Sequence, residues 1–172
     1  MQVKAILGDI TKFEADAIVN AANCTLLGGG GVDGAIHRAA GPKLLLHCMT
    51  LGGCKTGEAK ITPGFRLPAK YIIHTPGPRY PSMKPDVAEE KLHNCYWNSL
   101  SLADQHECRT IAFPSISTGI YRFPLDRAAS IVAETFVEYA QTHETGIDEV
   151  TMVCFDQTTY DAYCNAFHSA GL

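Results

Sequence analysis

The stretch from Val19 to His37 reads VNAANCTLLGGGGVDGAIH and holds most of the information in this 172-residue chain. An apolar run typical of a buried strand leads through a polar turn to four consecutive glycines, and a helical pattern follows. Four glycines lose much conformational freedom on folding, whereas a plain turn needs only one or two. Backbone amides at this point, with the positive end of a helix dipole, predict a phosphate site. A flexible hairpin tip is the alternative.

Short apolar runs recur on both sides of this stretch and are typical of strands covered on both faces. The expected strands are 3–7, 17–20, 59–62, 71–75, 110–114 and 149–155. Helical patterns lie between or beyond them, at 33–40, 42–51, 86–106, 124–142 and 160–168. This alternation predicts an α/β fold with helices on both faces of a sheet. Ligands in such folds bind beyond the carboxyl ends of the strands, so the loops there should carry the function.

Length and composition predict a single globular domain over residues 1–172, with 46% hydrophobic and 19% charged residues. The net charge of −4 argues against binding a nucleic-acid backbone through bulk positive charge, but it permits a pocket for one small anion. We find no membrane-spanning or signal segment, so we expect a cytoplasmic protein with no membrane partner. The seven cysteines lack metal-site spacing, which favours free thiols.

Residues 29–34 also fit the Gly-x-Gly-x-x-Gly pattern of dinucleotide-binding folds. In that pattern the glycines directly follow a strand, and an acidic residue lies about 20 residues later. Here a polar turn intervenes and Cys54 occupies the approximate position of the acid. A Rossmann-type NAD enzyme is therefore kept only as an alternative.

Polar side chains around the glycines each allow a functional and a local interpretation. Asn20 and Asn23 can bind sugar hydroxyls, because an amide both donates and accepts, or they can satisfy turn amides. Asp33 can act as a base at the mouth of the pocket, but its local sequence favours a helix cap. His37 follows one turn later on the same helix face, where packing or capping is the commoner role.

A second loop, from Ala112 to Pro124, reads AFPSISTGIYRFP and joins a buried strand to a helix. Its residues Ser117 to Gly119 can present amides and hydroxyls to a second phosphate, or they can form an exposed polar turn. Two small-residue loops that each lead into a helix favour a pyrophosphate between them. Tyr121 can pack on a sugar or be an ordinary loop aromatic.

The first and last strands end in residues that suit an adenosine. Asp9 can accept a hydrogen bond from an exocyclic amine, or it can cap the turn before Thr11. Phe155 can stack on a base, or it can pack in the core.

Together these motifs resemble the macrodomain family, in its MacroD-like bacterial branch of O-acetyl-ADP-ribose deacetylases and ADP-ribosyl hydrolases. The resemblance covers essentially the whole chain, through residues 8–11, 19–23, 27–37, 39–42, 56–59, 73–75, 114–121 and 154–156. It implies a three-layer α/β/α sandwich around a mixed, largely parallel sheet, with an ADP-ribose cleft across the loop end of the sheet.

The resemblance also implies residue roles, carried over by matched position. Asp9 and the Ile10 amide would bind the adenine amine, and Phe155 would stack near the adenine. Asn23 would hold the distal ribose, Tyr121 would pack on it, and Asp33 would position or activate a water; these three are the expected catalytic residues. The diphosphate would lie among Gly30, Gly31, Val32, Ser117, Thr118, Gly119, Ile120 and Tyr121. Asn20, counted with the ligand-binding residues, would support the loop, whereas His37 and Asp156 have no assigned role.

The implied reaction is hydrolysis at the distal ribose, without a metal or a cofactor. The expected substrates and partners are ADP-ribose, O-acetyl-ADP-ribose and proteins that carry mono-ADP-ribose on acidic side chains. A non-catalytic ADP-ribose reader is the alternative, and the presence of both Asn23 and Asp33 favours the enzyme. The chain departs from the family at Arg122, where glycine is usual. If that position has positive φ an arginine is strained; otherwise Arg122 either reaches a phosphate or substrate carboxylate or stays solvated.

Overall fold

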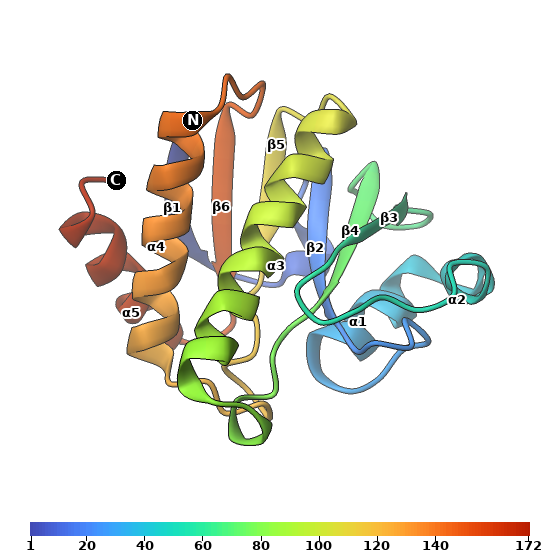
Figure 1. Cartoon of the computed structure of the whole chain (residues 1–172). Helices are drawn as coiled ribbons and strands as arrows, with labels where there is room; N and C mark the ends of the chain where they lie inside the picture. The colour runs from blue at the N-terminus through green and yellow to red at the C-terminus, as the bar shows by residue number, and fades with distance from the viewer.

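The computed structural model describes every residue from 1 to 172 and contains one six-stranded sheet flanked by helices (Figure 1). The strands are β1 (Gln2–Leu7), β2 (Ala17–Ala22), β3 (Lys60–Pro63), β4 (Tyr71–Pro76), β5 (Thr110–Phe113) and β6 (Glu149–Cys154). The α-helices are α1 (Gly31–Ala40), α2 (Pro42–Met49), α3 (Pro85–Gln105), α4 (Leu125–Thr142) and α5 (Gln157–Ser169). Two short 3-10 turns, η1 (Ile10–Lys12) and η2 (Tyr80–Ser82), complete the chain.

Every expected strand and helix is confirmed, with boundaries that shift by a few residues at most. The shift that matters lies at α1, which begins at Gly31 and not at Asp33. Gly30 is the N-cap residue of α1 and has no side chain to offer, so the capping interpretation of Asp33 is wrong. Asp33 instead lies inside the first turn of the helix.

The strand order is β1-β6-β5-β2-β4-β3, and every neighbouring pair is parallel except β3 with β4. The predicted mixed, largely parallel sheet is therefore confirmed. In the classical dinucleotide-binding order the first strand lies inside the sheet, whereas β1 here is an edge strand. The Rossmann alternative is therefore wrong for this chain.

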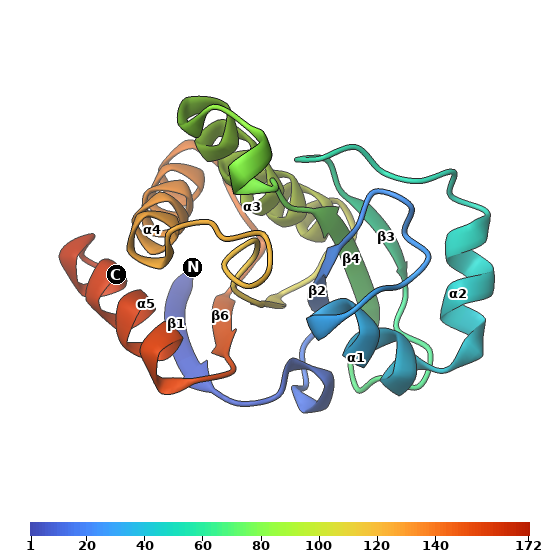
Figure 2. The ribbon, with the colours of Figure 1, turned by 90° about the horizontal axis from the view of Figure 1, so that it is seen from below.

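Alternate residues of the central strands enter two separate cores, as a sheet covered on both faces requires. Val19 and Ile73 belong to the larger core, which is built with α3, α4 and α5. Ile18 and Ile72 belong to the smaller core, which is built with α1 and α2. The two groups of helices lie on opposite sides of the sheet (Figure 2), which confirms the three-layer sandwich.

Three general properties follow from the same coordinates. No helix combines the length and the apolar character that a bilayer crossing would need. All seven cysteines are unpaired. No three His, Cys, Asp or Glu side chains come together in a way that could hold a metal ion.

Candidate active site

A cavity of about 710 Å³ lies at the carboxyl ends of four adjacent strands, β1, β6, β5 and β2. Its wall comes from the loops that follow these strands and from the start of α1 (Figure 2). The predicted site residues that line it are Asp9, Ile10, Asn23, Gly30, Gly31, Val32, Asp33, Ser117, Thr118, Gly119, Ile120, Tyr121, Phe155 and Asp156. One cavity of a size typical for small-molecule sites therefore unites segments from the whole length of the chain.

Two groups of backbone N–H donors face each other across this cavity. At the start of α1, the amides of Gly31, Val32 and Asp33 make no hydrogen bond within the protein. In the loop after β5, the amides of residues 117–121 also have no acceptor. Free amides at a helix start, reinforced by the helix dipole, attract an anion, and two such groups suit a ligand with two phosphates.

The helix α1 approaches the glycine loop closely because of two glycines. Gly31 has a φ of +57°, in the left-handed region that favours glycine. A Cβ atom at Gly34 would lie 2.4 Å from the carbonyl oxygen of Gly29, so a larger residue there would push the loop away. Close backbone approach, inferred from the run of glycines, is therefore a property of this helix start.

Asp33 is the buried carboxylate of the site, with 4% of the residue exposed. Its Oδ1 accepts a hydrogen bond from Asn20 Nδ2 at 2.9 Å and lies 3.5 Å from His37 Nε2. Its Oδ2 has no partner, although Asp33 lines the cavity. Burial raises the pKa of Asp33, and the hydrogen bond from Asn20 and the charge of His37 offset part of that rise. A carboxylate with a raised pKa and a free oxygen can accept a proton from water.

Asn20 does not contact the cavity, which corrects its assignment to the ligand-binding residues. It is fully buried, because β2 is paired on both sides and α1 covers its face. Its amide nitrogen binds Asp33 instead, so it supports the site from behind. His37 also lies outside the cavity lining and contacts Asp33 from the next turn of α1.

Asn23 lines the cavity and also shapes the glycine loop. Its Nδ2 donates to the carbonyl oxygen of Gly28 at 2.6 Å, and its Oδ1 accepts from the backbone and hydroxyl of Thr25. A second N–H of the same nitrogen is left for a ligand. Both interpretations of this asparagine, turn residue and ligand donor, are thus compatible with one orientation of its side chain.

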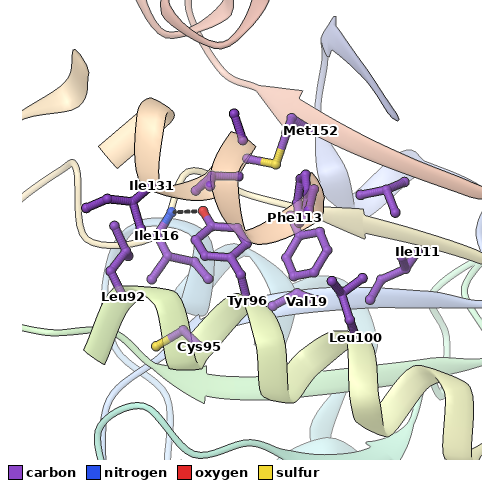
Figure 3. Packing of buried hydrophobic residues seen from close by; sticks show 14 of the residues in the cluster. Val19, Leu92, Cys95, Tyr96, Leu100, Ile111, Phe113, Ile116, Ile131 and Met152 are labelled. Atoms are coloured by element: carbon purple, nitrogen blue, oxygen red, sulfur yellow. Dashed lines mark hydrogen bonds between the residues drawn. The ribbon is translucent and has the colours of Figure 1, made fainter. Parts of the chain in front are cut away.

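Two buried tyrosines hold the loop after β5 from below. The Tyr96 hydroxyl accepts a hydrogen bond from the Ile116 amide at 3.1 Å (Figure 3). The same hydroxyl donates to the carbonyl oxygen of Pro114, also at 3.1 Å. The Tyr163 hydroxyl lies 2.8 Å from Ser115 Oγ, which in turn lies 2.6 Å from Thr118 Oγ1. These contacts fix the loop in the conformation that leaves its amides free.

At the other end of the cavity, Asp9 and Asp156 both cap short segments. Asp9 Oδ1 accepts from the backbone and hydroxyl of Thr11, and the side-chain hydrogen bond is the main reason why the pKa of Asp9 is lowered. The cap interpretation of Asp9 is confirmed, and its second oxygen is left for a ligand. Asp156 caps α5 through the Thr159 amide. Phe155 is 92% exposed, so its core interpretation is wrong.

Arg122 has a φ of +56°, the strained conformation expected if a residue other than glycine stands there. Its side chain is exposed and does not line the cavity, in contrast to Tyr121. Sequence reasoning missed Arg38 and Gly77, which also line the cavity. Arg38 follows Gly31 on α1 by seven residues, about two helical turns, and Gly77 follows β4, so helix spacing and strand ends were the available signals.

Known proteins resemble this chain over nearly its full length. A sequence model for the family described as Macro domain matches residues 19–132. A macro domain-containing protein of Lactiplantibacillus plantarum is 57% identical over 166 residues, which are 96% of this chain and 96% of that protein. The ADP-ribose glycohydrolase MACROD2 of Xenopus laevis is 52% identical over 156 residues, which are 91% of this chain and 37% of that protein. A solved structure of an Oceanobacillus iheyensis macrodomain mutant with ADPR has a TM-score of 0.90 at 44% identity, covering 96% of this chain and 91% of that one.

Proposed function

This chain belongs to the Macro domain family, and on that premise we propose that it binds ADP-ribose and hydrolyses esters at the distal ribose. The proposed substrates are O-acetyl-ADP-ribose and proteins that carry mono-ADP-ribose on glutamate or aspartate. Similarity to an ADP-ribose glycohydrolase and to a macrodomain solved with ADPR supports this choice.

The shape of the cavity suits the three parts of ADP-ribose. The adenine fits between the free oxygen of Asp9 and the exposed ring of Phe155. The diphosphate fits between the two groups of free amides, at the start of α1 and in residues 117–121. The distal ribose then lies beside Asn23 and Asp33, the two lining residues that hold a spare amide proton and an unpartnered, buried carboxylate oxygen.

The observation that carries the proposal is the unpartnered Oδ2 of the buried Asp33, in a cavity wall that also holds the two groups of free backbone amides. In the proposed reaction this oxygen takes one proton from a water while the water oxygen attacks the acyl carbon of the ester. The bond between the acyl carbon and the ribose oxygen breaks, and the proton passes to that ribose oxygen. The products are ADP-ribose and a carboxylic acid, either acetic acid or the protein side chain, which releases its own proton to solvent and becomes the carboxylate.

The test is a time course of acetate release from O-acetyl-ADP-ribose, with ADP-ribosylated protein in parallel and with a chelator in one arm. We expect turnover that the chelator leaves unchanged. Asp33→Ala should lower kcat by about 100-fold or more, while ADP-ribose affinity stays within about threefold, because the amides that hold the diphosphate remain.

Asp126→Ala is the matched control, since Asp126 is an exposed carboxylate in the first turn of α4, outside the cavity. It should leave both quantities unchanged. ADP-ribose binding without turnover on either substrate would make the protein a reader of ADP-ribose. Unchanged turnover in Asp33→Ala would remove Asp33 from the mechanism.

A further inference from the structure

A row of buried polar side chains leads from Asp33 away from the cavity and into the sheet. Thr62 on β3, His74 on β4 and Asn20 on β2 are each at most 2% exposed, and none of them lines the cavity. Asn20 and His74 are register partners in neighbouring parallel strands. Ile72, two residues before His74 on the same face, is an ordinary core residue. Thr62 lies diagonally across from His74, because its direct register partner is Ile72. Connected polar residues on an otherwise apolar face need a reason, and the row ends at Asp33.

The hydrogen bonds of this row determine where each proton lies. Thr62 Oγ1 donates its single proton to the carbonyl oxygen of Pro63 at 3.1 Å, so it must accept from His74 Nε2 at 3.0 Å. Burial lowers the pKa of His74 to about 3, so its ring carries one proton at neutral pH, and that proton is on Nε2. His74 Nδ1 is then an acceptor for Asn20 Nδ2 at 3.1 Å. The second proton of that nitrogen is donated to Asp33 Oδ1.

We propose that His74 and Thr62 are positioning residues for Asp33, which rests on the hydrolase function proposed above. Thr62 selects the Nε2–H tautomer of His74, and that tautomer keeps the amide nitrogen of Asn20 directed at Asp33. One carboxylate oxygen is thereby held, and the other is buried without a protein partner. The direction of every hydrogen bond in the row is therefore set by Thr62 on β3, which lies on the far side of β4 from Asp33.

The opposite tautomer would break this arrangement at Asp33. With a proton on His74 Nδ1, Asn20 would have to turn its Oδ1 toward the ring, or lose that bond. Its amide nitrogen would then no longer hold Asp33 Oδ1, and a turned amide would place an oxygen against the carboxylate. Because the hydrogen bond from Asn20 lowers the pKa of Asp33, its loss raises that pKa further.

The experiment compares Thr62→Val, which removes the hydroxyl at nearly constant volume, with Thr62→Ser, which keeps it. We expect Thr62→Val to lower kcat about tenfold with KM and ADP-ribose affinity within about twofold, because the cavity wall is unchanged. Thr62→Ser should recover most of the lost kcat. Ile18→Val controls for packing, since it trims the same buried face, and the register partners of Ile18 are Ile72 and Ala112, not residues of the row. It should lower stability and leave kcat unchanged.

The acidic limb of the kcat profile is the second readout. Asp33 must be ionised to accept a proton, so a higher pKa moves this limb to higher pH in Thr62→Val and not in Thr62→Ser. The other titratable or charged groups around Asp33 are His37 and Arg38 on α1, Cys48 on α2 and His74 on β4. The Thr62 substitutions replace none of these side chains, and the only change expected among them is the position of the ring proton of His74. A role in folding alone would change the unfolding midpoint and leave this limb in place.

Nuclear magnetic resonance tests the proposal in the absence of any substrate. Correlations from the ring protons of His74 to its two nitrogens should show Nε2 protonated and Nδ1 unprotonated from about pH 5 to 8. The carboxyl carbon of Asp33 should titrate at higher pH in Thr62→Val than in wild type. If both of these results are obtained but no turnover is observed, the proposed hydrolase function is wrong, whereas the proposed positioning of Asp33 by His74 and Thr62 stands. A proton on His74 Nδ1, or an unchanged Asp33 titration, would overturn the proposal even if turnover is observed.

Discussion

Arg122 shows how one residue can carry strain without entering a site. A φ of +56° destabilises a non-glycine residue by about 1 kcal/mol, and glycine would relieve this strain. Glycine also loses more conformational freedom on folding, which cancels part of the gain in stability. We therefore predict that Arg122→Gly raises the free energy of unfolding by about 0.5 kcal/mol. ADP-ribose affinity should change by less than about tenfold, because the side chain is exposed and outside the cavity. Urea unfolding and calorimetry measure the two quantities.

Glu107 is the matched control for Arg122, since it is exposed, has a φ of 57° and lies away from the cavity, just beyond α3. Glu107→Gly should give a similar gain in stability with no change in affinity. A loss of affinity well beyond tenfold in Arg122→Gly alone would make Arg122 an anchor for the ligand.

Sequence reasoning at the residue scale reached about half of the residues in the cavity wall, because these lie in loops where glycine, hydroxyl and amide side chains are conspicuous. It failed for the residues behind the wall. In the sequence alone Asp33 resembles a helix cap, and only the fold shows that its side chain is buried and accepts a hydrogen bond from Asn20. His74 lies in one of the segments that carry the family resemblance, but no pattern in the sequence assigns it a role. A histidine and an asparagine inside apolar strands were the available signal, and only strand pairing reveals that they meet.

The loop after β5 depends on a helix that is distant in sequence. The hydroxyl of Tyr96 on α3 accepts a hydrogen bond from the Ile116 amide (Figure 3). It also donates one to the Pro114 carbonyl oxygen. Tyr96→Phe leaves both backbone groups buried without a partner, which we predict will lower the free energy of unfolding by about 2 kcal/mol. ADP-ribose affinity should fall several-fold, because the loop amides are no longer fixed before binding.

Tyr139→Phe separates the effect on the loop from general loss of stability. This substitution on α4 removes the hydrogen bond that the Tyr139 hydroxyl donates to Asp104, and neither residue lines the cavity. It should lower stability and leave ADP-ribose affinity as in wild type. Equal affinities in Tyr96→Phe and wild type would show that the loop keeps its conformation without the hydroxyl.

Elements were more predictable than their ends. Periodicity located every strand and helix, because a sheet covered on both faces forces short apolar runs and its helices expose one face. The start of α1 was misplaced because glycines at 30 and 31 carry no helix signal, although Gly31 begins the helix. The antiparallel direction of β3 follows from no local pattern, and only the family resemblance implied a mixed sheet.

The net charge of −4 describes the whole molecule and conceals how it would bind an anion. Neither group of amides at the cavity contributes to that count, because backbone dipoles carry no formal charge. The charge therefore argues against long polyanions that need many cations at once. It does not argue against a compact diphosphate held by fixed amides, so composition and site are consistent.

Tolerance of acid is a property of the whole fold, and His74 makes it predictable. Burial lowers the pKa of His74 from 6.5 to about 3, so between these values the unfolded chain binds more protons than the folded protein. The free energy of unfolding should therefore decrease as the pH is lowered, by up to about 1.4 kcal/mol per pH unit between about pH 6 and pH 4. Carboxylates with a lowered pKa, such as Asp9, add losses mainly below this window, whereas Asp33, with a raised pKa, acts in the opposite direction. Urea unfolding followed by Trp97 fluorescence measures the slope, and His74→Gln, uncharged at every pH, should reduce it. Equal slopes in the two proteins would mean that the folded state accepts a proton at His74, which the closed row from Thr62 to Asp33 does not allow.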